Sequence, residues 1–205
     1  YPLWFTILTS LGFKVVISGR SNHDLFATGM ESIPSENVCY PAKLSHGHIE
    51  WLLKKGIKTI FMPCVSYEVK QFKEADNNFN CPIVAFYPQV LKNNIDRLAD
   101  DDITFLNPFV NLDNPDKLVD RLMETFEPWG VTLAEMKSAV AAGYEEMDKV
   151  HADIKAEGDR ALQYMREHNM HGIVLAGRPY HIDPEINHGI PEMITTLGMA
   201  VLSED

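Results

Sequence analysis

Apolar and polar positions along the chain follow two different periods. Four short apolar runs are rich in β-branched and aromatic residues, which predicts strands. These runs span residues 13–19, 58–64, 82–87 and 103–109. Three amphipathic stretches instead repeat their apolar positions at helical spacing, which predicts helices. They span residues 4–12, 41–56 and 116–126, and glycines close the first two. Because strands and helices alternate, the pattern predicts an α/β fold.

Such alternation favours a largely parallel sheet with helices on both faces, of the Rossmann or flavodoxin-like kind. A region of helical period then covers residues 131–169, where Gly143 and Gly158 are the expected weak points. This region is much longer than the average helix of about 11 to 12 residues. After it, a strand, a glycine-bearing loop, a helix and another strand repeat the plan. We therefore expect a first α/β domain at 1–130, a helical connector at 131–169 and the start of a second α/β domain at 170–205.

The net charge of the chain argues against two classes of binding partner. The 205 residues include 29 acidic and 18 basic ones, which gives a formal net charge of −11. Such a chain lacks the basic field that binds phosphate backbones and would be repelled by anionic membranes, so we expect neither nucleic acid nor a membrane as partner. No apolar run reaches the length of a membrane span, and the first residues lack the pattern of a secretory signal. The chain starts at Tyr1 inside an apolar segment, so we expect it to be a piece of a longer polypeptide.

Three widely separated cysteines are the first candidates for chemistry. An odd number of thiols makes no disulfide framework, and without a signal segment we expect a reducing, cytoplasmic setting. Cys39 precedes Pro41, which suits a first helical position, so Cys39 lies near the positive end of a helix dipole, a setting that favours a thiolate. Cys64 closes a predicted strand, and ligands of α/β sheets bind beyond the carboxyl ends of strands. We expect Cys39 and Cys64 to face a common cavity, as a thiolate-ligated cluster requires.

Cys81 is harder to place. It precedes the strand predicted at 82–87, and the start of a parallel strand lies at the opposite edge of the sheet. The spacing C-x24-C-x16-C also matches no standard cluster or zinc pattern. For each of the three thiols, a buried and inert cysteine is the alternative interpretation.

Four stretches of the sequence point to a known family. They read IPSENVCYPAKLSHGHI, FMPCVSYEV, NNFNCPIVAFYP and AGRPYHIDPEINHGIPEMI. They closely resemble the domain of CoA-substrate-specific enzyme activase-related proteins, which are relatives of the 2-hydroxyacyl-CoA dehydratase subunits (the 2-hydroxyglutaryl-CoA dehydratase family). The likeness covers nearly the whole chain. In the related dehydratases, three cysteines hold a 4Fe-4S cluster, and an electron delivered at the expense of ATP starts the radical removal of water from a 2-hydroxyacyl-CoA.

The resemblance implies an iron-sulfur component of a dehydratase or activase system, acting in low-potential electron transfer or in radical dehydration of a CoA thioester. It implies Cys39, Cys64 and Cys81 as ligands of a 4Fe-4S cluster. It also implies an acyl-CoA substrate or an activase or dehydratase protein as partner. A lyase and an ATP-dependent activator component both remain open as the enzyme class, and a homo-oligomer remains open as the assembly.

Polar residues near the first cysteine are further candidates. Lys43 lies in the first helical turn, where it would stabilise a thiolate or an anionic ligand, or else be a solvated helix lysine. His46 and His48 are two residues apart on a helix, so they point in different directions and form no helical chelate. His48 falls in the apolar arc of its helix, and we interpret it as a histidine with its hydrogen bonds satisfied.

The loop after the strand that opens the second domain is dense in functional side chains. Arg178 suits a carboxylate or phosphate, and His181 suits proton transfer or metal binding, so we expect both to be catalytic. Tyr180 and His188, together with Lys43, are the expected cofactor-binding residues. The alternative is a loop locked by its own hydrogen bonds.

Two other classes of function stay open. One is a cluster-free regulatory or assembly module that binds a partner through its acidic surface. The other is a mononuclear zinc site built from cysteines and a histidine, which would be structural if four ligands closed it.

Overall fold

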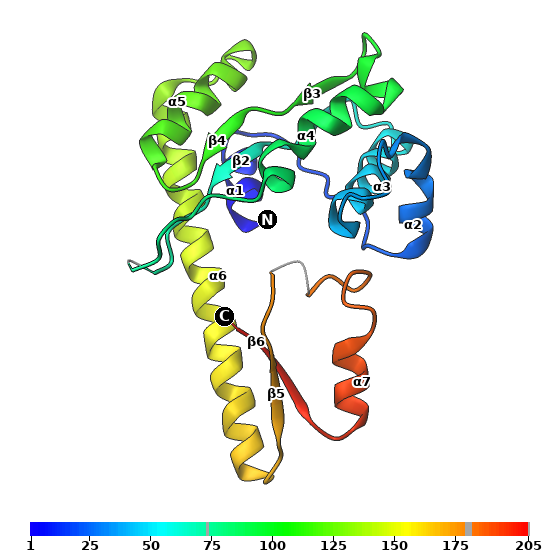
Figure 1. The fold of residues 1–205 in the computed structure, drawn as a ribbon. Coiled ribbons are helices and arrows are strands. Elements are labelled where there is room, and N and C mark those ends of the chain that lie inside the picture. Colours follow the sequence, from blue (N-terminus) through cyan, green and yellow to red (C-terminus); the bar gives the residue numbers. More distant parts are fainter. Residues whose placement is uncertain (73, 179–181, 205) are drawn as a thin grey trace.

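The computed structural model describes residues 1–72, 74–178 and 182–204. An upper body holds five helices and four short strands, and the long helix α6 leads from it to a lower unit of β5, α7 and β6 (Figure 1). In chain order the elements are α1 (Pro2–Ser10), α2 (His23–Thr28), η1 (Met30–Ser32), α3 (Tyr40–Lys54), β1 (Thr59–Phe61), β2 (Cys64–Tyr67), α4 (Pro82–Asn94), η2 (Asp96–Ala99), β3 (Thr104–Leu106), β4 (Phe109–Asn111), α5 (Pro115–Phe126), η3 (Glu127–Trp129), α6 (Leu133–Glu167), β5 (Gly172–Leu175), α7 (Ile190–Thr196) and β6 (Ala200–Ser203).

The strands of the upper body form one parallel ribbon that prolines interrupt. β1 pairs with β3, and β2 pairs with β4, both in parallel. Pro63 lies between β1 and β2, and Pro108 lies between β3 and β4; neither has the N–H that a ladder needs. The alignment continues across the break, because Met62 donates its N–H to the carbonyl of Leu106 at 2.9 Å and Cys64 donates to Pro108 at 2.8 Å.

Helices cover both faces of this ribbon. Ile60 and its cross-strand partner Phe105 belong to a buried cluster with residues of α3 and α4. The next pair, Phe61 and Leu106, packs against the second buried cluster, which α1, β4, α5 and α6 form. The alternation follows from the period of two residues along a strand. Parallel strands between helix layers confirm the α/β class that the sequence predicts.

The finer sheet prediction is not borne out. Helices dominate the chain, and the named strand pairs of the described residues are two-stranded, so a broad Rossmann or flavodoxin-like sheet is not seen. Residues 13–19 form no strand. Residues 82–87 are helical, because Pro82 occupies the start of α4 with Cys81 as its N-cap. Cys64 opens β2 instead of closing a strand, since Pro63 divides the run predicted at 58–64.

The predicted connector is a single helix. α6 runs for 35 residues without a break at either glycine, and Thr132 and Glu135 form a capping box at its start. Gly143 lies where α1 crosses α6: a Cβ there would come within 2.8 Å of Ile7 Cγ1 and 3.1 Å of the Leu3 carbonyl oxygen. A Cβ at Gly158 would meet nothing within 4 Å. Gly143 is therefore a close-packing position and not a hinge.

The lower unit repeats the parallel plan. β5 pairs with β6 in parallel over four residue pairs, from Gly172 with Ala200 to Leu175 with Ser203, and α7 lies in the crossover between them. In Figure 1, β5 and α7 lie below the upper body that holds the ribbon. Among the helices in the described ranges, none combines the length and the apolar character that crossing a membrane requires.

A buried histidine joins three elements of the upper body. The His46 ring is fully buried, with Nδ1 at 2.7 Å from the hydroxyl of Ser32 and Nε2 at 2.9 Å from the hydroxyl of Tyr87. These bonds tie α3 to η1 and α4. Burial lowers the pKa of His46 to about 4, so the ring is neutral in the folded protein.

This lowered pKa predicts acid sensitivity. Between about pH 6.5 and pH 4 the unfolded chain takes up a proton at His46 that the folded chain refuses, so the free energy of unfolding falls as the pH is lowered through this window. At about 1.4 kcal/mol per unit the loss amounts to roughly 3 kcal/mol. Urea unfolding at a series of pH values should therefore show that the free energy of unfolding depends less on pH in His46→Gln than in the native chain. The exposed His151→Gln is the matched control, and equal slopes for all three proteins would contradict the assignment.

The two glycines of α6 make a second prediction. Gly158→Ala should raise the melting temperature, because alanine is better than glycine in a helix by about 1 kcal/mol. Gly143→Ala gains the same propensity but should lower the melting temperature, because its Cβ would collide with α1. Calorimetry of both variants gives the comparison. Equal stabilisation by both would show that α1 does not pack on α6 as described.

Candidate functional site

Helix α3 is positioned by the close approach of α2. A Cβ added at Gly47 would lie 2.1 Å from the Leu25 carbonyl oxygen, so only glycine permits this crossing. The histidines on either side of Gly47 are two residues apart on the helix, so their side chains point in different directions. His46 turns into the core between α3 and α4, whereas His48 turns toward the segment at 18–21. This confirms that the two histidines form no chelate.

His48 is part of a polar chain that reaches the lower unit. Its Nδ1 lies 2.8 Å from the hydroxyl of Ser18, and its Nε2 lies 3.1 Å from the hydroxyl of Ser21. Ser21 is buried and donates its one hydrogen to the carboxylate of Asp183 at 2.5 Å. Nε2 of His48 must therefore carry the proton that it shares with Ser21, and Nδ1 accepts from Ser18. Burial lowers the pKa of His48, and the charge of Asp183 partly offsets this shift. A neutral ring is the form that this chain of hydrogen bonds requires.

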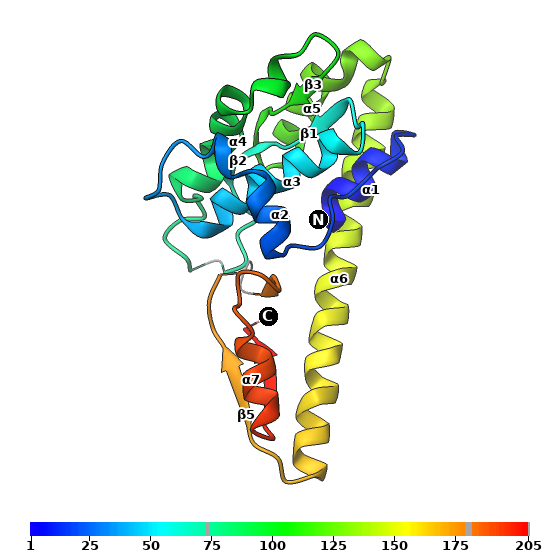
Figure 2. The same ribbon diagram turned by 90° about the vertical axis from the view of Figure 1, so that its right-hand side faces the viewer.

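A second contact joins the same loop to the start of α3. The hydroxyl of Tyr40 donates to the carboxylate of Glu185 at 2.8 Å, and the ring of His188 stacks on Tyr40 at 6.3 Å between centroids. Burial and then the bond to Glu185 raise the pKa of Tyr40 to about 12, so the phenol remains a donor. Figure 2 shows the loop before α7 beneath α2 and α3. We call residues 182–189 the docking loop.

The docking loop is shaped by its own capping bonds as well. Oδ1 of Asp183 accepts the N–H groups of Glu185 and Ile186 at 2.9 and 3.1 Å, while its Oδ2 accepts from Ser21. Asp183 thus locks the loop with hydrogen bonds of its own, which is the alternative given for this loop, and it also contacts the upper body. His188 has a positive φ of 53°, a conformation that non-glycine residues adopt infrequently.

Two of the three cysteines lie at helix α4, and the third lies at the start of α3. Cys81 is the N-cap of α4, and the buried Cys64 opens β2, the strand that packs on α4. Burial raises the pKa of Cys64, and the backbone N–H of Gln89 in α4 partly offsets this rise. Burial also raises the pKa of Tyr87 in α4, and Cys39 adds to this effect. Cys39 itself is exposed and is the N-cap of α3.

The thiols are suitable donors for a cluster, but their positions do not make a finished ligand set. In residues 1–72, 74–178 and 182–204, no three His, Cys, Asp or Glu side chains lie together as metal ligands. Cys64 is fully covered, whereas Cys39 faces solvent. The helix that replaces the strand predicted at 82–87 removes the objection to Cys81, because it gives Cys81 and Cys39 the same N-cap setting.

The other predicted site residues are divided between two places. Lys43 donates from Nζ to the carbonyl oxygen of Glu36 at 2.5 Å, which holds the polypeptide just before Cys39. His188 stacks on Tyr40, next to Cys39 in the chain. Arg178 lines a cavity between the lower unit and the segment that carries Arg20. Tyr180 and His181 lie outside the described residues.

We call the contacts between the docking loop and the upper body the junction. The upper-body residues of this junction were not identified from the sequence. Ser21 and Arg20 belong to a polar segment that follows the apolar run at 13–17, and the sequence carried that signal as the string Gly-Arg-Ser-Asn. Arg20 lines the same cavity as Arg178, although 158 positions separate their numbers in the sequence. The role of Tyr40 as donor to Glu185 was not predicted either.

The contacts of the docking loop generate a third prediction. Ser21→Ala removes the donor to Asp183, and a hydrogen bond to a charged group contributes about 1.5 to 3 kcal/mol. Amide hydrogen exchange at Glu185 and Ile186 should therefore quicken at least about tenfold. Ser45→Ala is the matched control, because Ser45 bonds only to Ala42 of its own helix. Unchanged exchange in the Ser21 variant would show that the loop is held without this bond.

Comparison with known proteins gives one match. The model of the family described as the CoA enzyme activase uncharacterised domain (DUF2229) matches residues 1–205. No curated protein matches, and no solved structure matches. The likeness to activase-related proteins is therefore confirmed over residues 1–205. This chain belongs to the CoA enzyme activase uncharacterised domain family.

Proposed function

We propose that this domain is the iron-sulfur component of a CoA enzyme activase system of the 2-hydroxyacyl-CoA dehydratase type. It would take part in low-potential electron transfer or in radical dehydration of a CoA thioester, with an activase or dehydratase protein as its partner. Membership in the activase family supports the general assignment. The finer assignment is supported by the positions of Cys81 at the N-cap of α4, of Cys64 in the strand that packs on α4, and of Cys39 at the N-cap of α3.

Each cysteine has a physical reason to be a ligand in this proposal. Cys39 and Cys81 lie at helix N-termini, where the backbone N–H groups and the helix dipole favour negative charge. Cys64 lies in β2, which packs on the same α4. Thiolates are the donors that iron-sulfur clusters use. Cys64 is buried, so ligation by all three cysteines requires a rearrangement around Cys64 that cluster reconstitution of the isolated chain would bring about.

The docking loop has a role in this proposal because it contacts the helix that Cys39 caps. Tyr40 follows Cys39 directly and binds both Glu185 and His188. Lys43 fixes the approach to Cys39 and supplies a positive charge in the first turn of α3. We assign His188 and Lys43, with Tyr180, to cofactor or acyl-CoA binding. Arg178 and His181 would serve the acyl group or the partner enzyme.

A cluster-free regulatory or assembly module is the second candidate. The observation that favours it is that no three potential ligands converge among the described residues. In that case the cysteines would be structural, and Cys64 in particular would be an inert core residue, as its burial allows.

Iron and sulfide analysis separates the two candidates and makes the fourth prediction. After anaerobic cluster reconstitution, the native chain should bind iron and sulfide, and Cys39→Ser and Cys81→Ser should lose most of both, because an alkoxide poorly replaces a soft thiolate. Cys64→Ala should lose them as well; alanine avoids burying a hydroxyl at this covered position. Ser45→Ala is the control, and circular dichroism checks each fold. A native chain that stays colourless and iron-free would refute the cluster and leave the regulatory module.

A further inference from the structure

A cavity of about 430 Å³ lies where the carboxyl ends of β5 and β6 meet the segment that carries Arg20. The ends of parallel strands are the usual ligand position in α/β units, and small-molecule sites measure about 300 to 1,000 Å³. Much of the wall is apolar. The apolar residues are Leu175, Ile182, Pro184, Pro191, Val201 and Leu202.

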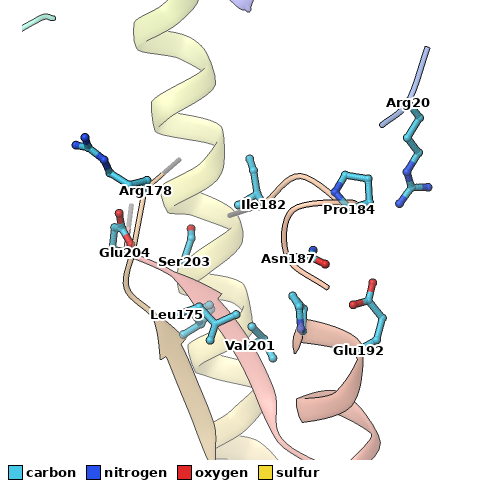
Figure 3. Close-up of a pocket in the computed structure, with 12 residues that line it drawn as sticks. Arg20, Leu175, Arg178, Ile182, Pro184, Asn187, Glu192, Val201, Ser203 and Glu204 are labelled. Carbon is cyan, nitrogen blue, oxygen red and sulfur yellow. The ribbon is translucent and has the colours of Figure 1, made fainter. Parts of the chain in front are cut away.

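Four charged residues line this cavity, two basic and two acidic. Figure 3 shows Arg178 with Glu204 at one end and Arg20 with Glu192 at the other. Glu204 is already engaged, because it accepts the N–H of Gly177 at 2.6 Å. Within the part of the chain that the structure describes, Arg20 and Glu192 form no ion pair with each other or with any other residue. Both charged groups therefore retain their bonding capacity.

The backbones that carry these two groups are held in place. The side-chain amide of Asn22 donates to the carbonyl oxygen of Arg20 at 3.1 Å, and the neighbouring Ser21 is bonded to Asp183 of the docking loop. Glu192 lies in the first turn of α7, directly after Pro191. The backbones that carry the cation and the anion are thus held beside an apolar wall, so a ligand that fits both charges needs to order only their side chains.

We propose that this cavity binds a free α-amino acid with an apolar side chain. The carboxylate of the ligand pairs with the guanidinium of Arg20, which suits it because the planar fork donates two parallel bonds. The ammonium pairs with Glu192, and the side chain covers the apolar wall. A simple anion would be repelled by Glu192 and a simple cation by Arg20, so only a zwitterion satisfies both. The site needs no cluster and goes beyond the proposed function.

The ligand would also join the two parts of the molecule. Arg20 belongs to the upper body, whereas Glu192 belongs to the lower unit. A molecule that binds both adds its binding free energy to the contacts of the docking loop, because it binds the docked form better than the undocked one. The amino acid therefore acts as an effector that favours docking.

Calorimetric titration of the whole chain with three probes of one shape provides the fifth prediction. L-leucine carries both charges, 4-methylpentanoate only the carboxylate, and 3-methylbutylamine only the ammonium. Leucine should bind best. Arg20→Gln should weaken leucine binding about tenfold or more, since a charge-assisted bidentate contact is lost. Glu192→Gln should weaken leucine similarly but leave 4-methylpentanoate undiminished. Arg166→Gln, an exposed arginine at the far end of α6, is the matched control.

Three results would overturn the proposal. The first is a native chain that binds no leucine, and the second is an Arg20→Gln variant that binds it as well as the native chain does. The third is inorganic phosphate or 4-methylpentanoate binding as tightly as leucine, which would make the cavity an anion site. Arg20 and Glu192 both lie at the surface of the cavity and outside the core clusters, so circular dichroism should show intact folds for their variants.

Discussion

The absence of a side chain at Gly47 is the constraint on which the arrangement of the upper body depends. The backbone of α2 lies against α3 there so closely that a methyl group would collide with the carbonyl of Leu25. This contact fixes α3, and α3 in turn presents a different residue to each neighbour. His46 bonds to α4, His48 to the segment at 18–21, and Tyr40 to the docking loop. The His-Gly-His sequence thus allows α2 and α3 to pack closely at its glycine, while its two histidines bond to different neighbours.

The polar residues of the junction compensate for a shortage of apolar contact between the two parts of the molecule. Both buried core clusters of the described residues lie within the upper body and the helices attached to it, and neither includes a described residue of β5, α7 or β6. The lower unit is therefore joined to α3 by hydrogen bonds and one ring stack, contacts that water can replace at modest cost. An interface of this kind opens more readily than a hydrophobic one, and opening it would free the ring of Tyr40, which follows the exposed Cys39.

The sequence predicted the helices better than the strands, for reasons visible in individual residues. Gly12 and Gly56 end helices as expected, with φ of 85° and 77°. The apolar run at 82–87 predicts a strand only ambiguously, because short apolar runs fit either structure, and the decisive signal is Pro82 at a helix start. The run at 13–19 has strand composition, but pairing also requires a partner strand, which local sequence does not specify. The junction was unpredictable for the same reason, since Ser21 and Asp183 are brought together only by the folded chain.

The length of the continuous helix α6 also fixes the direction in which the lower unit faces around the helix axis. It rises for 35 residues, roughly 50 Å, and each residue is rotated by about 100° about the axis from the residue before it. Inserting or deleting one residue would swing β5 and the docking loop around the helix axis, away from α3, while leaving the fold of each part intact. Only changes of about seven residues, two full turns, would restore the direction, and these would still displace the lower unit by about 10 Å along the axis. The length of α6 is therefore as specific as the identity of any side chain at the junction.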